Sequence, residues 1–274
     1  FQIQIVIFDS REIAYDIRGL EVIDLHLASR PGKFAKLWNV IRRACKIHQL
    51  KKKEGTDIAY SFGPTANIAN IVSGGKAEKW LGIRSYMDMD NRGQIKWFCK
   101  KADRVICCSE RICREVEEKY GCTRAVTLHN PFDMREIESL AGQEAAALPW
   151  EEGRILVSMG REDSVKGFWH LLKSFAIIHE ALPDTKLMII GQGEYVQYKE
   201  LAAGLGVEDA VCFTGLKKNP YPYLKRSSLY VLTSYNEGFP NALVEAMALG
   251  VPVVATDCMT GPREILEEKY GILV

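Results

Sequence analysis

The chain has 274 residues, enough for one large or two ordinary domains of about 100–200 residues each. Hydrophobic residues make up 47% and charged residues 26%, and 36 basic side chains balance 35 acidic ones, which excludes a disordered or collagen-like chain and gives no support to bulk electrostatic binding of nucleic acid. No window approaches the roughly 20 apolar residues of a membrane-spanning helix, and the start lacks the basic-then-apolar plan of a secretory signal, so a cytoplasmic protein is expected.

The first half alternates short β-rich runs with helical patterns. Strands separated by helices imply crossover connections and a mainly parallel sheet. The chain opens inside a strand pattern without a methionine, and we expect that an earlier strand is missing. Strands are predicted at residues 3–8, 57–61, 81–86, 104–108 and 125–128, and helices at residues 33–50, 94–101 and 109–120.

Residues 133–152 have a weaker, helical pattern, are acidic and rich in alanine, and are the predicted linker. After them the alternation restarts and ends in another strand-like run, so closing helices are expected to be missing. Strands are predicted at residues 155–159, 186–190, 211–213, 228–233 and 251–256, and helices at residues 167–182, 195–204, 222–227 and 241–249. Two such series predict an α/β fold with two doubly wound, Rossmann-like domains at residues 1–140 and 141–274.

The sequence predicts no metal site. The chain has eight cysteines but no CxxC pair, and Cys107 and Cys108 lie in an apolar run, so buried free thiols are expected rather than disulfides or zinc ligands. Asp88-Met89-Asp90 has the D-x-D form by which some enzymes hold a divalent metal. A solvated loop is the preferred interpretation, because the other candidate ligand-binding residues lie in the second half.

The loop after the strand at 155–159 combines two cations with glycines. Arg161 and Lys166 lie between Gly160 and Gly167, just before a predicted helix. Because ligands of doubly wound sheets bind beyond the carboxyl ends of the strands, this loop suits a diphosphate. A solvated turn with surface charges is the alternative.

The loop after the strand at 186–190 begins as a dinucleotide fingerprint would. Gly191 and Gly193 provide the first two glycines, but Val196 stands where the third belongs. The first half has no such motif either. A nicotinamide-dependent dehydrogenase therefore loses its main support.

The loop after the strand at 228–233 leads into a helix that begins near Pro240 or Asn241. The free N–H groups of its first turn form an anion site. Glu237 and Glu245 flank this position, and carboxylates accept hydrogen bonds from sugar hydroxyls. Two alternatives remain open: the glutamates complement the helix dipole, or they form the carboxylate pair of a glycoside hydrolase.

These motifs resemble a known family. Seven residues separate Glu237 from Glu245 within EGFPNALVEAMALGVPVVAT, and GREDSVKG and Phe213-Thr214-Gly215 precede them in that order. The sequence resembles the GT4 family of retaining glycosyltransferases, which have the GT-B fold, two Rossmann-like domains with a cleft between them. The resemblance covers residues 155–266, and in the first half it depends on ADRVICCSE at 102–110 and HNPFD at 129–133.

The resemblance implies roles for the donor-side positions. Arg161 and Lys166 would bind the diphosphate, Glu237 the transferred sugar and Glu245 the ribose hydroxyls. Leu216 would contact the base through its backbone, and Gly191 would line the cleft. The expected catalytic residues are Glu237, Arg161 and Lys166, and the expected donor-binding residues are Gly160, Arg161, Lys166, Gly191, Leu216, Glu237, Gly238, Phe239, Pro240, Asn241, Ala242, Leu243 and Glu245.

The implied reaction moves a hexosyl unit from a nucleotide sugar, expected to be a UDP-sugar, to a hydroxyl of a glycan or lipid-linked acceptor. No cofactor or metal is expected, since the cations and the helix terminus can stabilise the departing diphosphate. A nucleotide-sugar epimerase or hydrolase of similar fold and a non-catalytic nucleotide-binding module stay open as alternatives.

Two further features bear on the acceptor. Arg84 and Ser85 follow a predicted strand and are candidates for contact with the acceptor or donor. Lys51-Lys52-Lys53, preceded by Arg42, Arg43 and Lys46, gives a helix a basic end. A solvated face is the preferred interpretation of this end, and peripheral contact with an anionic membrane at its inner face is the functional one.

Overall fold

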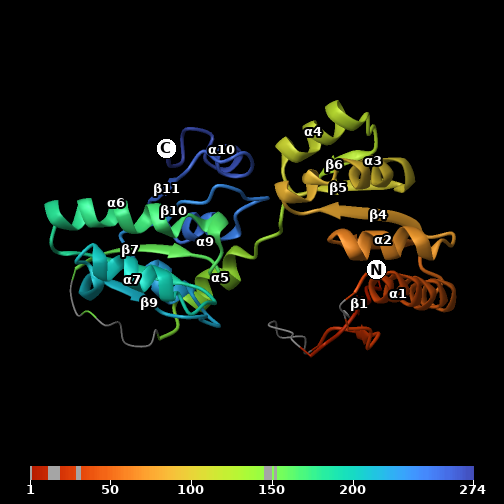
Figure 1. Ribbon diagram of the computed structural model, residues 1–274, viewed down its shortest axis with the longest axis horizontal. Coiled ribbons are helices and arrows are strands. Elements are labelled where there is room, and N and C mark those ends of the chain that lie inside the picture. Colours follow the sequence, from red (N-terminus) through yellow and green to blue (C-terminus); the bar gives the residue numbers. More distant parts are fainter. Residues whose placement is uncertain (1, 12–18, 29–31, 145–149, 151–152) are drawn as a thin grey trace. The chain divides into compact units, whose positions relative to one another are not determined.

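The computed structural model describes residues 2–11, 19–28, 32–144, 150 and 153–274. The chain forms two compact units (Figure 1). The first unit comprises residues 1–84, 88–107 and 113–127, and the second comprises residues 85–87, 108–112 and 128–274. Each unit contains a parallel sheet with helices connecting its strands.

The first unit is built on a four-stranded sheet in the order β3-β4-β5-β6, and a separate ribbon pairs β1 with β2 in parallel. The centre of the sheet is apolar: Leu81, Ile83, Val105 and Ile106 are all buried. The strands are β1 (Ile5–Ile7), β2 (Val22–Asp24), β3 (Ile58–Phe62), β4 (Glu78–Ile83), β5 (Arg104–Cys107) and β6 (Ala125–Thr127), and the helices are α1 (Lys33–Lys53), α2 (Pro64–Ser73), α3 (Arg92–Lys101) and α4 (Glu110–Tyr120).

The second unit is built on a six-stranded parallel sheet in the order β12-β11-β10-β7-β8-β9. Its strands are β7 (Arg154–Met159), β8 (Thr185–Ile190), β9 (Val211–Phe213), β10 (Leu229–Leu232), β11 (Val253–Ala255) and β12 (Ile272–Leu273). Its helices are α5 (Met134–Ala141), α6 (Phe168–Ala181), α7 (Val196–Gly204), α8 (Tyr221–Lys225), α9 (Asn241–Ala248) and α10 (Pro262–Leu266).

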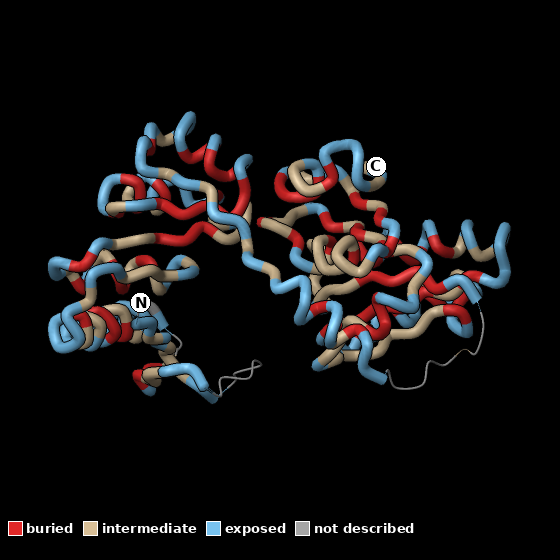
Figure 2. Tube along the Cα trace, turned by 180° about the vertical axis from the view of Figure 1, so that it is seen from behind, coloured by how far each residue is buried: buried red, intermediate tan, exposed pale blue. Residues whose placement is uncertain are grey.

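Strand β7 shows why the second sheet is covered on both faces. Ile155 and Val157 belong to one apolar cluster, with side chains of α8, α9 and α10, whereas Leu156 belongs to another, with side chains of α6 and α7. Successive strand residues point to opposite faces, so a continuous apolar run requires helices on both sides. In each unit the buried residues lie both in the strands and in the helices that connect them (Figure 2).

Helices α2 and α10 lie where the sequence analysis predicts none. Helix α2 begins at Pro64, a residue whose fixed φ suits the first turn of a helix. Helix α5 lies inside the expected linker. It is capped by Asp133, whose carboxylate accepts the N–H groups of Arg135 and Glu136 at 3.0 Å, and it packs against α8 and α9 of the second unit.

Candidate active site

The candidate site lies in the second unit, beyond the carboxyl ends of β7, β8 and β10. Strand β7 is hydrogen-bonded to β8 on one side and to β10 on the other. The loops that follow these strands, at residues 160–167, 191–195 and 233–240, therefore meet at one edge of the sheet. This is where doubly wound sheets bind ligands.

Backbone contacts fix the first loop against the third. The N–H of Tyr235 donates to the carbonyl of Val165 at 2.8 Å, and the Thr233 hydroxyl donates to the carbonyl of Lys166 at 2.8 Å. Gly167, between them in space, has a φ of +64°, and a Cβ there would lie closer than 3.0 Å to the Thr233 carbonyl. Only glycine meets both demands, so the start of α6 depends on it.

The loop at residues 160–167 is also in close contact with the loop at residues 191–195. A Cβ on Gly191 would lie closer than 3.0 Å to the carbonyl oxygen of Gly160. The Gly160 carbonyl also accepts the hydroxyl of Tyr195 at 2.8 Å, and a carboxylate oxygen of Glu162 accepts the N–H groups of Glu194 and Tyr195 at 2.9 Å. The glycine predicted to line the cleft thus lets two loops approach each other.

The sequence analysis does not predict the hydrogen bonds by which Glu162 and Tyr195 join the loops at residues 160–167 and 191–195. Tyr195 is buried and has a φ of +56°, a conformation uncommon for residues other than glycine. Burial raises the pKa of its hydroxyl to about 12. In the sequence, Glu162 stands out only as an acidic residue in a loop of mixed charge. No local pattern predicts that it binds the turn at Glu194 and Tyr195.

The structure brings together two of the three predicted catalytic residues. Lys166 Nζ lies 2.7 Å from Glu237 Oε1, and the side chains are 21% and 11% exposed. The Ser234 hydroxyl donates to the same Glu237 oxygen at 2.6 Å, and the Thr260 hydroxyl donates to the Glu237 carbonyl. The pair therefore has a defined geometry and limited access to water, which strengthens its electrostatic effect on a ligand.

Arg161, the third predicted catalytic residue, is placed differently. Its side chain is 75% exposed, and its guanidinium lies 3.2 Å from the carboxylate of Asp163. Leu216 is also exposed. Both residues lie in loops at the edge of the sheet that bears Lys166 and Glu237, and neither is held by packing.

Helix α9 presents the predicted anion site. It begins at Asn241 after Pro240, and no side chain caps it. The first-turn N–H groups of Asn241 and Ala242 are therefore without a capping partner from a side chain. Gly238 and Pro240 are buried and Phe239 is half-buried, while the Leu243 side chain belongs to the core, so only the backbone of Leu243 can serve a ligand.

Glu245 lies one turn further along α9 and is half-buried. Burial raises the pKa of its carboxyl, and a hydrogen bond with Tyr221 of α8 partly offsets this shift. A buried carboxylate is costly unless it accepts hydrogen bonds, so hydroxyl groups of a ligand would be favourable partners for Glu245. Nearby in sequence, Asn236 Oδ1 is buried without a hydrogen-bond partner in the described part of the chain.

The segment around His129 borders the start of α9. The imidazole of His129 stacks on Phe239 with ring centroids 4.8 Å apart, and its Nε2 pairs with the carboxylate of Glu264. The amide of Asn130 donates to Asn241. These contacts hold the segment at residues 129–133 against the start of α9.

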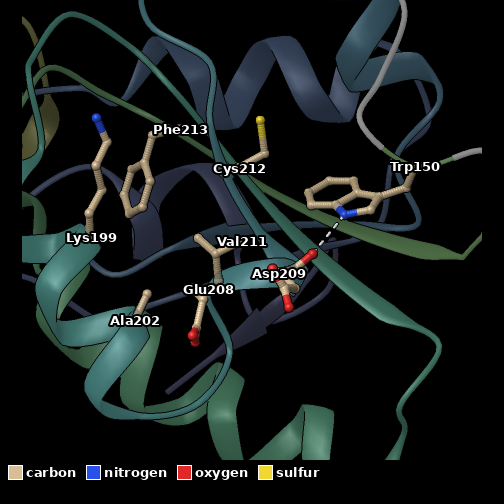
Figure 3. A pocket seen from close by; sticks show the side chains of 8 residues that line it. All are labelled: Trp150, Lys199, Ala202, Glu208, Asp209, Val211, Cys212 and Phe213. Carbon is tan, nitrogen blue, oxygen red and sulfur yellow. Dashed lines mark hydrogen bonds between the residues drawn. The ribbon is translucent and has the colours of Figure 1, made fainter.

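A cavity of the second unit lies away from these loops. It has a volume of about 350 Å³ and contains none of the predicted site residues (Figure 3). Trp150 Nε1 donates to the carbonyl of Asp209 at 3.1 Å across it. It lies at the edge strand β9, and its lining residues are Trp150, Lys199, Ala202, Glu208, Asp209, Val211, Cys212 and Phe213. Its lining lacks the clustered cations and helix terminus that a diphosphate needs, so the loops remain the better candidate.

In the described residues no group of three or more histidine, cysteine or acidic side chains could hold a metal ion. Asp88 and Asp90 belong to a short 3₁₀ turn at Tyr86–Asp90, and a carboxylate oxygen of Asp88 accepts the N–H of Arg84 at 3.0 Å. The guanidinium of Arg84 also lies 5.7 Å from the ring centroid of Phe62. The D-x-D run thus takes part in a local turn.

The chain is similar in sequence to known glycosyltransferases. The sequence profile described as "Glycosyl transferases group 1" matches residues 143–274. An uncharacterized glycosyltransferase of Methanocaldococcus jannaschii is 33% identical over 272 residues, covering 90% of this chain and 67% of the relative. A Campylobacter jejuni enzyme, the N-acetylgalactosamine-N,N'-diacetylbacillosaminyl-diphospho-undecaprenol 4-alpha-N-acetylgalactosaminyltransferase, is 28% identical over 298 residues, covering 100% of this chain and 78% of the relative.

Solved structures agree on the fold. A crystal structure of a TarM variant of S. aureus with UDP superposes with a TM-score of 0.70 at 21% identity, covering 86% of this chain and 48% of that one. Sucrose-phosphate synthase of Thermosynechococcus elongatus superposes with a TM-score of 0.75 at 16% identity, covering 99% and 75%. The predicted α/β fold with two parallel-sheet, Rossmann-like domains of GT-B type is confirmed. The chain spans about half the length of the TarM chain.

Proposed function

The chain belongs to the group 1 glycosyl transferases, the GT4 family of retaining glycosyltransferases, and we propose that it transfers a hexosyl unit from a UDP-sugar to a hydroxyl of a glycan or lipid-linked acceptor. The observation that carries the proposal is the Lys166–Glu237 pair beside the uncapped start of α9. It places a cation, amide donors and a carboxylate at one edge of the sheet. A nucleotide diphosphate bound to a sugar needs these three kinds of partner.

The diphosphate is the part of the donor that these residues recognise best. Lys166 and the first-turn N–H groups of α9 favour negative charge, and Arg161, exposed in the neighbouring loop, can swing onto a phosphate. As the bond from the sugar C1 to the phosphate oxygen breaks, its electron pair moves to that oxygen. Fixed cations and amides stabilise the growing charge without requiring a metal ion.

Glu237 and Glu245 serve the sugars in this proposal. Glu237 is held by Lys166 and Ser234, so it can accept a hydrogen bond from the transferred sugar and position C1. Glu245, raised in pKa by burial, gains donors from the ribose hydroxyls. The acceptor hydroxyl then forms the new bond to C1 on the face from which the phosphate leaves. Its proton passes to the leaving phosphate oxygen, so no protein base is assigned.

Relatives support the choice of UDP and of the acceptor class. The TarM structure holds UDP, and the Campylobacter jejuni enzyme is named for a diphospho-undecaprenol acceptor. A lipopolysaccharide core biosynthesis glycosyltransferase of Rhizobium meliloti is 26% identical over 233 residues. We extend these acceptor classes to the present chain. In its described residues no helix is both long and apolar enough to cross a bilayer.

Incubation with a panel of UDP- and GDP-sugars tests the proposal, with release of UDP or GDP measured in the presence and absence of a polyprenyl-diphosphate-linked sugar. We expect UDP release that depends on the acceptor and a product that keeps the anomeric configuration of the donor. Conversion of the donor alone would favour an epimerase or hydrolase. Binding of UDP by calorimetry without any turnover would favour a non-catalytic module, and no binding of either nucleotide would overturn the site.

A further inference from the structure

Two cysteine thiols of the first unit lie against each other. Cys99 is in the last turn of α3, and Cys122 follows α4 shortly before β6. Both residues are buried, and the Cys99 thiol is hydrogen-bonded to the sulfur of Cys122. The function proposed above makes no use of this pair, because the residues proposed to bind the donor all belong to the second unit.

Arg124 contacts both cysteines. Its guanidinium donates to the carbonyl of Cys99 at 2.9 Å, and its backbone N–H donates to the sulfur of Cys122. The carbonyl of Cys122 in turn accepts the N–H of Ala125 at 3.3 Å. The backbone on both sides of the pair is therefore held in place, which keeps the two sulfur atoms in contact.

These contacts make Cys122 the more nucleophilic of the two cysteines. The hydrogen bond from Cys99 lowers the pKa of the Cys122 thiol, and the N–H and positive charge of Arg124 lower it further against the opposing effect of burial. The same hydrogen bond, together with burial, raises the pKa of Cys99, which therefore keeps its proton. A thiolate in contact with a thiol closes to a disulfide once the thiolate is oxidised.

Burial decides which class of oxidant suits the pair. Cys122 is buried, but Gly121, Thr123 and Arg124 beside it are exposed, so a short turn separates its sulfur from water. An oxidant must reach the sulfur before it can react. A small, uncharged hydroperoxide therefore suits this site better than a bulky low-molecular-weight disulfide does.

We propose that Cys99 and Cys122 are a hydroperoxide-reactive pair that closes to a reversible disulfide. The Cys122 thiolate attacks one oxygen of hydrogen peroxide: an S–O bond forms, the O–O bond breaks, and the other oxygen leaves as hydroxide, which takes up a proton to become water. The Cys99 sulfur then attacks the sulfenic sulfur of Cys122 and loses its proton, and the hydroxyl leaves as a second water. The two thiols lose two electrons, which reduce the peroxide, and a thiol reductant restores the pair.

The pair lies at the amino edge of the first sheet. Cys99 and Cys122 precede β5 and β6, which are parallel neighbours, and the N–H of Val105 donates to the carbonyl of Arg124 at 3.0 Å. Doubly wound sheets bind ligands at the opposite, carboxyl edge. The disulfide would therefore tie the end of α3 to the connection between α4 and β6 away from that edge, and it should stabilise the first unit.

Mass spectrometry tests the pair. The reduced protein is freed of reductant, treated with hydrogen peroxide, alkylated under denaturing conditions and digested without reduction. We expect a disulfide between Cys99 and Cys122 as the main cross-link, and dithiothreitol should remove it. In calorimetry, oxidation should raise the melting temperature of the unaltered protein but not that of Cys99→Ser or Cys122→Ser.

The two serine variants also separate the roles of the sulfurs. Cys99→Ser keeps a hydroxyl that can donate to the Cys122 thiolate but cannot form a disulfide, so sulfenic acid should accumulate at Cys122, where dimedone traps it. Cys122→Ser removes the thiolate, so dimedone labelling of Cys99 should be at least about tenfold slower than that of Cys122 in the first variant. Far-UV circular dichroism checks that both variants are folded.

Cys45→Ser and Cys113→Ser are the matched controls. Cys45 is exposed on α1, and Cys113 is buried on α4 of the same unit. Both variants should form the disulfide between Cys99 and Cys122 as fast as the unaltered protein does. The test needs no sugar donor or acceptor, so its outcome is independent of the proposed transferase function.

Three results would overturn the proposal. The first is no disulfide between Cys99 and Cys122 under conditions in which the exposed Cys45 is oxidised. The second is a main cross-link from Cys99 to Cys107, the thiol of β5 that also lies near it. The third is dimedone labelling of Cys99 in Cys122→Ser that is as fast as labelling of Cys122 in Cys99→Ser.

Discussion

At the scale of single residues, the site depends on the ion pair between Lys166 and Glu237. The two side chains come from loops 71 residues apart and are mostly withdrawn from water. Exposed ion pairs contribute little to stability because water screens them. A pair that is largely withdrawn from water, such as this one, interacts more strongly with the charge of a ligand. Lys166 can therefore stabilise a diphosphate while it orients the carboxylate that receives the sugar.

Replacing Lys166 tests this arrangement. Lys166→Met keeps an unbranched chain against Gly160 but removes the charge, so transfer should fall about 10²–10³-fold. UDP affinity should fall as well, since a phosphate contact is lost. Steady-state kinetics and calorimetry measure the two effects. The matched control is Lys199→Gln at the cavity of Figure 3, which should leave both unchanged; a loss in that variant alone would move the donor site to the cavity.

The raised pKa of Glu245 makes a second prediction, on stability. Burial shifts the folded-state pKa above the ordinary value of 4.5, so the folded protein binds this proton more tightly than the unfolded chain does. The contribution of Glu245 to the free energy of unfolding is therefore present at low pH and lost as the pH rises through the raised value. Glu245→Gln abolishes this dependence.

The difference in melting temperature between Glu245→Gln and the unaltered protein measures this effect. The melting temperature of Glu245→Gln should rise relative to that of the unaltered protein as the pH rises from about 4 to about 7. Effects of the other titrating groups cancel in the difference. A difference that stays constant over this range, or moves the other way, would show that Glu245 is not buried in its charged form.

At the scale of elements, the site depends on close contacts between loops more than on the strands themselves. Gly167 begins α6 against the Thr233 carbonyl, and Tyr195 begins α7 with its hydroxyl on the Gly160 carbonyl. These contacts set the distance between the loop that carries Lys166 and the loop that carries Glu237. A substitution in the loop that carries Lys166 should therefore also change the position of the loop that carries Glu237.

Gly167→Ala should destabilise the protein by about 3 kcal/mol or more, because the new Cβ meets backbone as well as an unfavourable φ. Gly250→Ala is the control. Gly250 has a similar φ of +72°, but a Cβ added there would meet no atom within 4 Å, so the cost should be about 1–2 kcal/mol. Urea unfolding gives both values. Equal losses would show that the contact with Thr233 carries no penalty.

At the scale of the whole molecule, each unit has its own sheet and its own buried core. The domain boundary between residues 140 and 141, drawn from the sequence, remains a proposal. Helix α5, which spans this boundary, packs on α8 and α9. Two separate cores can unfold separately, because cooperativity within a core exceeds cooperativity between cores. The residues proposed to bind the donor all belong to the second unit.

Calorimetry can test this organisation. We expect two unfolding transitions, of which UDP raises only the one that belongs to the second unit. The transition can be assigned by Gly250→Ala, which should lower it without moving the other. A single transition that shifts as a whole with UDP would mean that the two units unfold as one.

The α/β class, the two βα series, the family and the loops that carry the site all follow from the sequence alone. They do so because these features are local: strands and helices have their own periods, and the E-x7-E motif, the glycine turns and the first turn of α9 lie within short segments. Lys166, Glu237 and Glu245 could be named from these segments. The helix α2 was missed because Pro64 suits a turn and a first helical position equally well.

Which residues meet became clear only from the folded chain. Nothing in the local pattern pairs Lys166 with Glu237, links Glu162 to Tyr195, or buries Lys51 against Asn70 while Trp38 on the same helix faces solvent. Lys51 was expected on a solvated basic end, yet burial lowers its pKa to about 8. A side chain's environment depends on elements distant in sequence, so the charge pairs of the site and the burial of Lys51 are decided only by the tertiary structure.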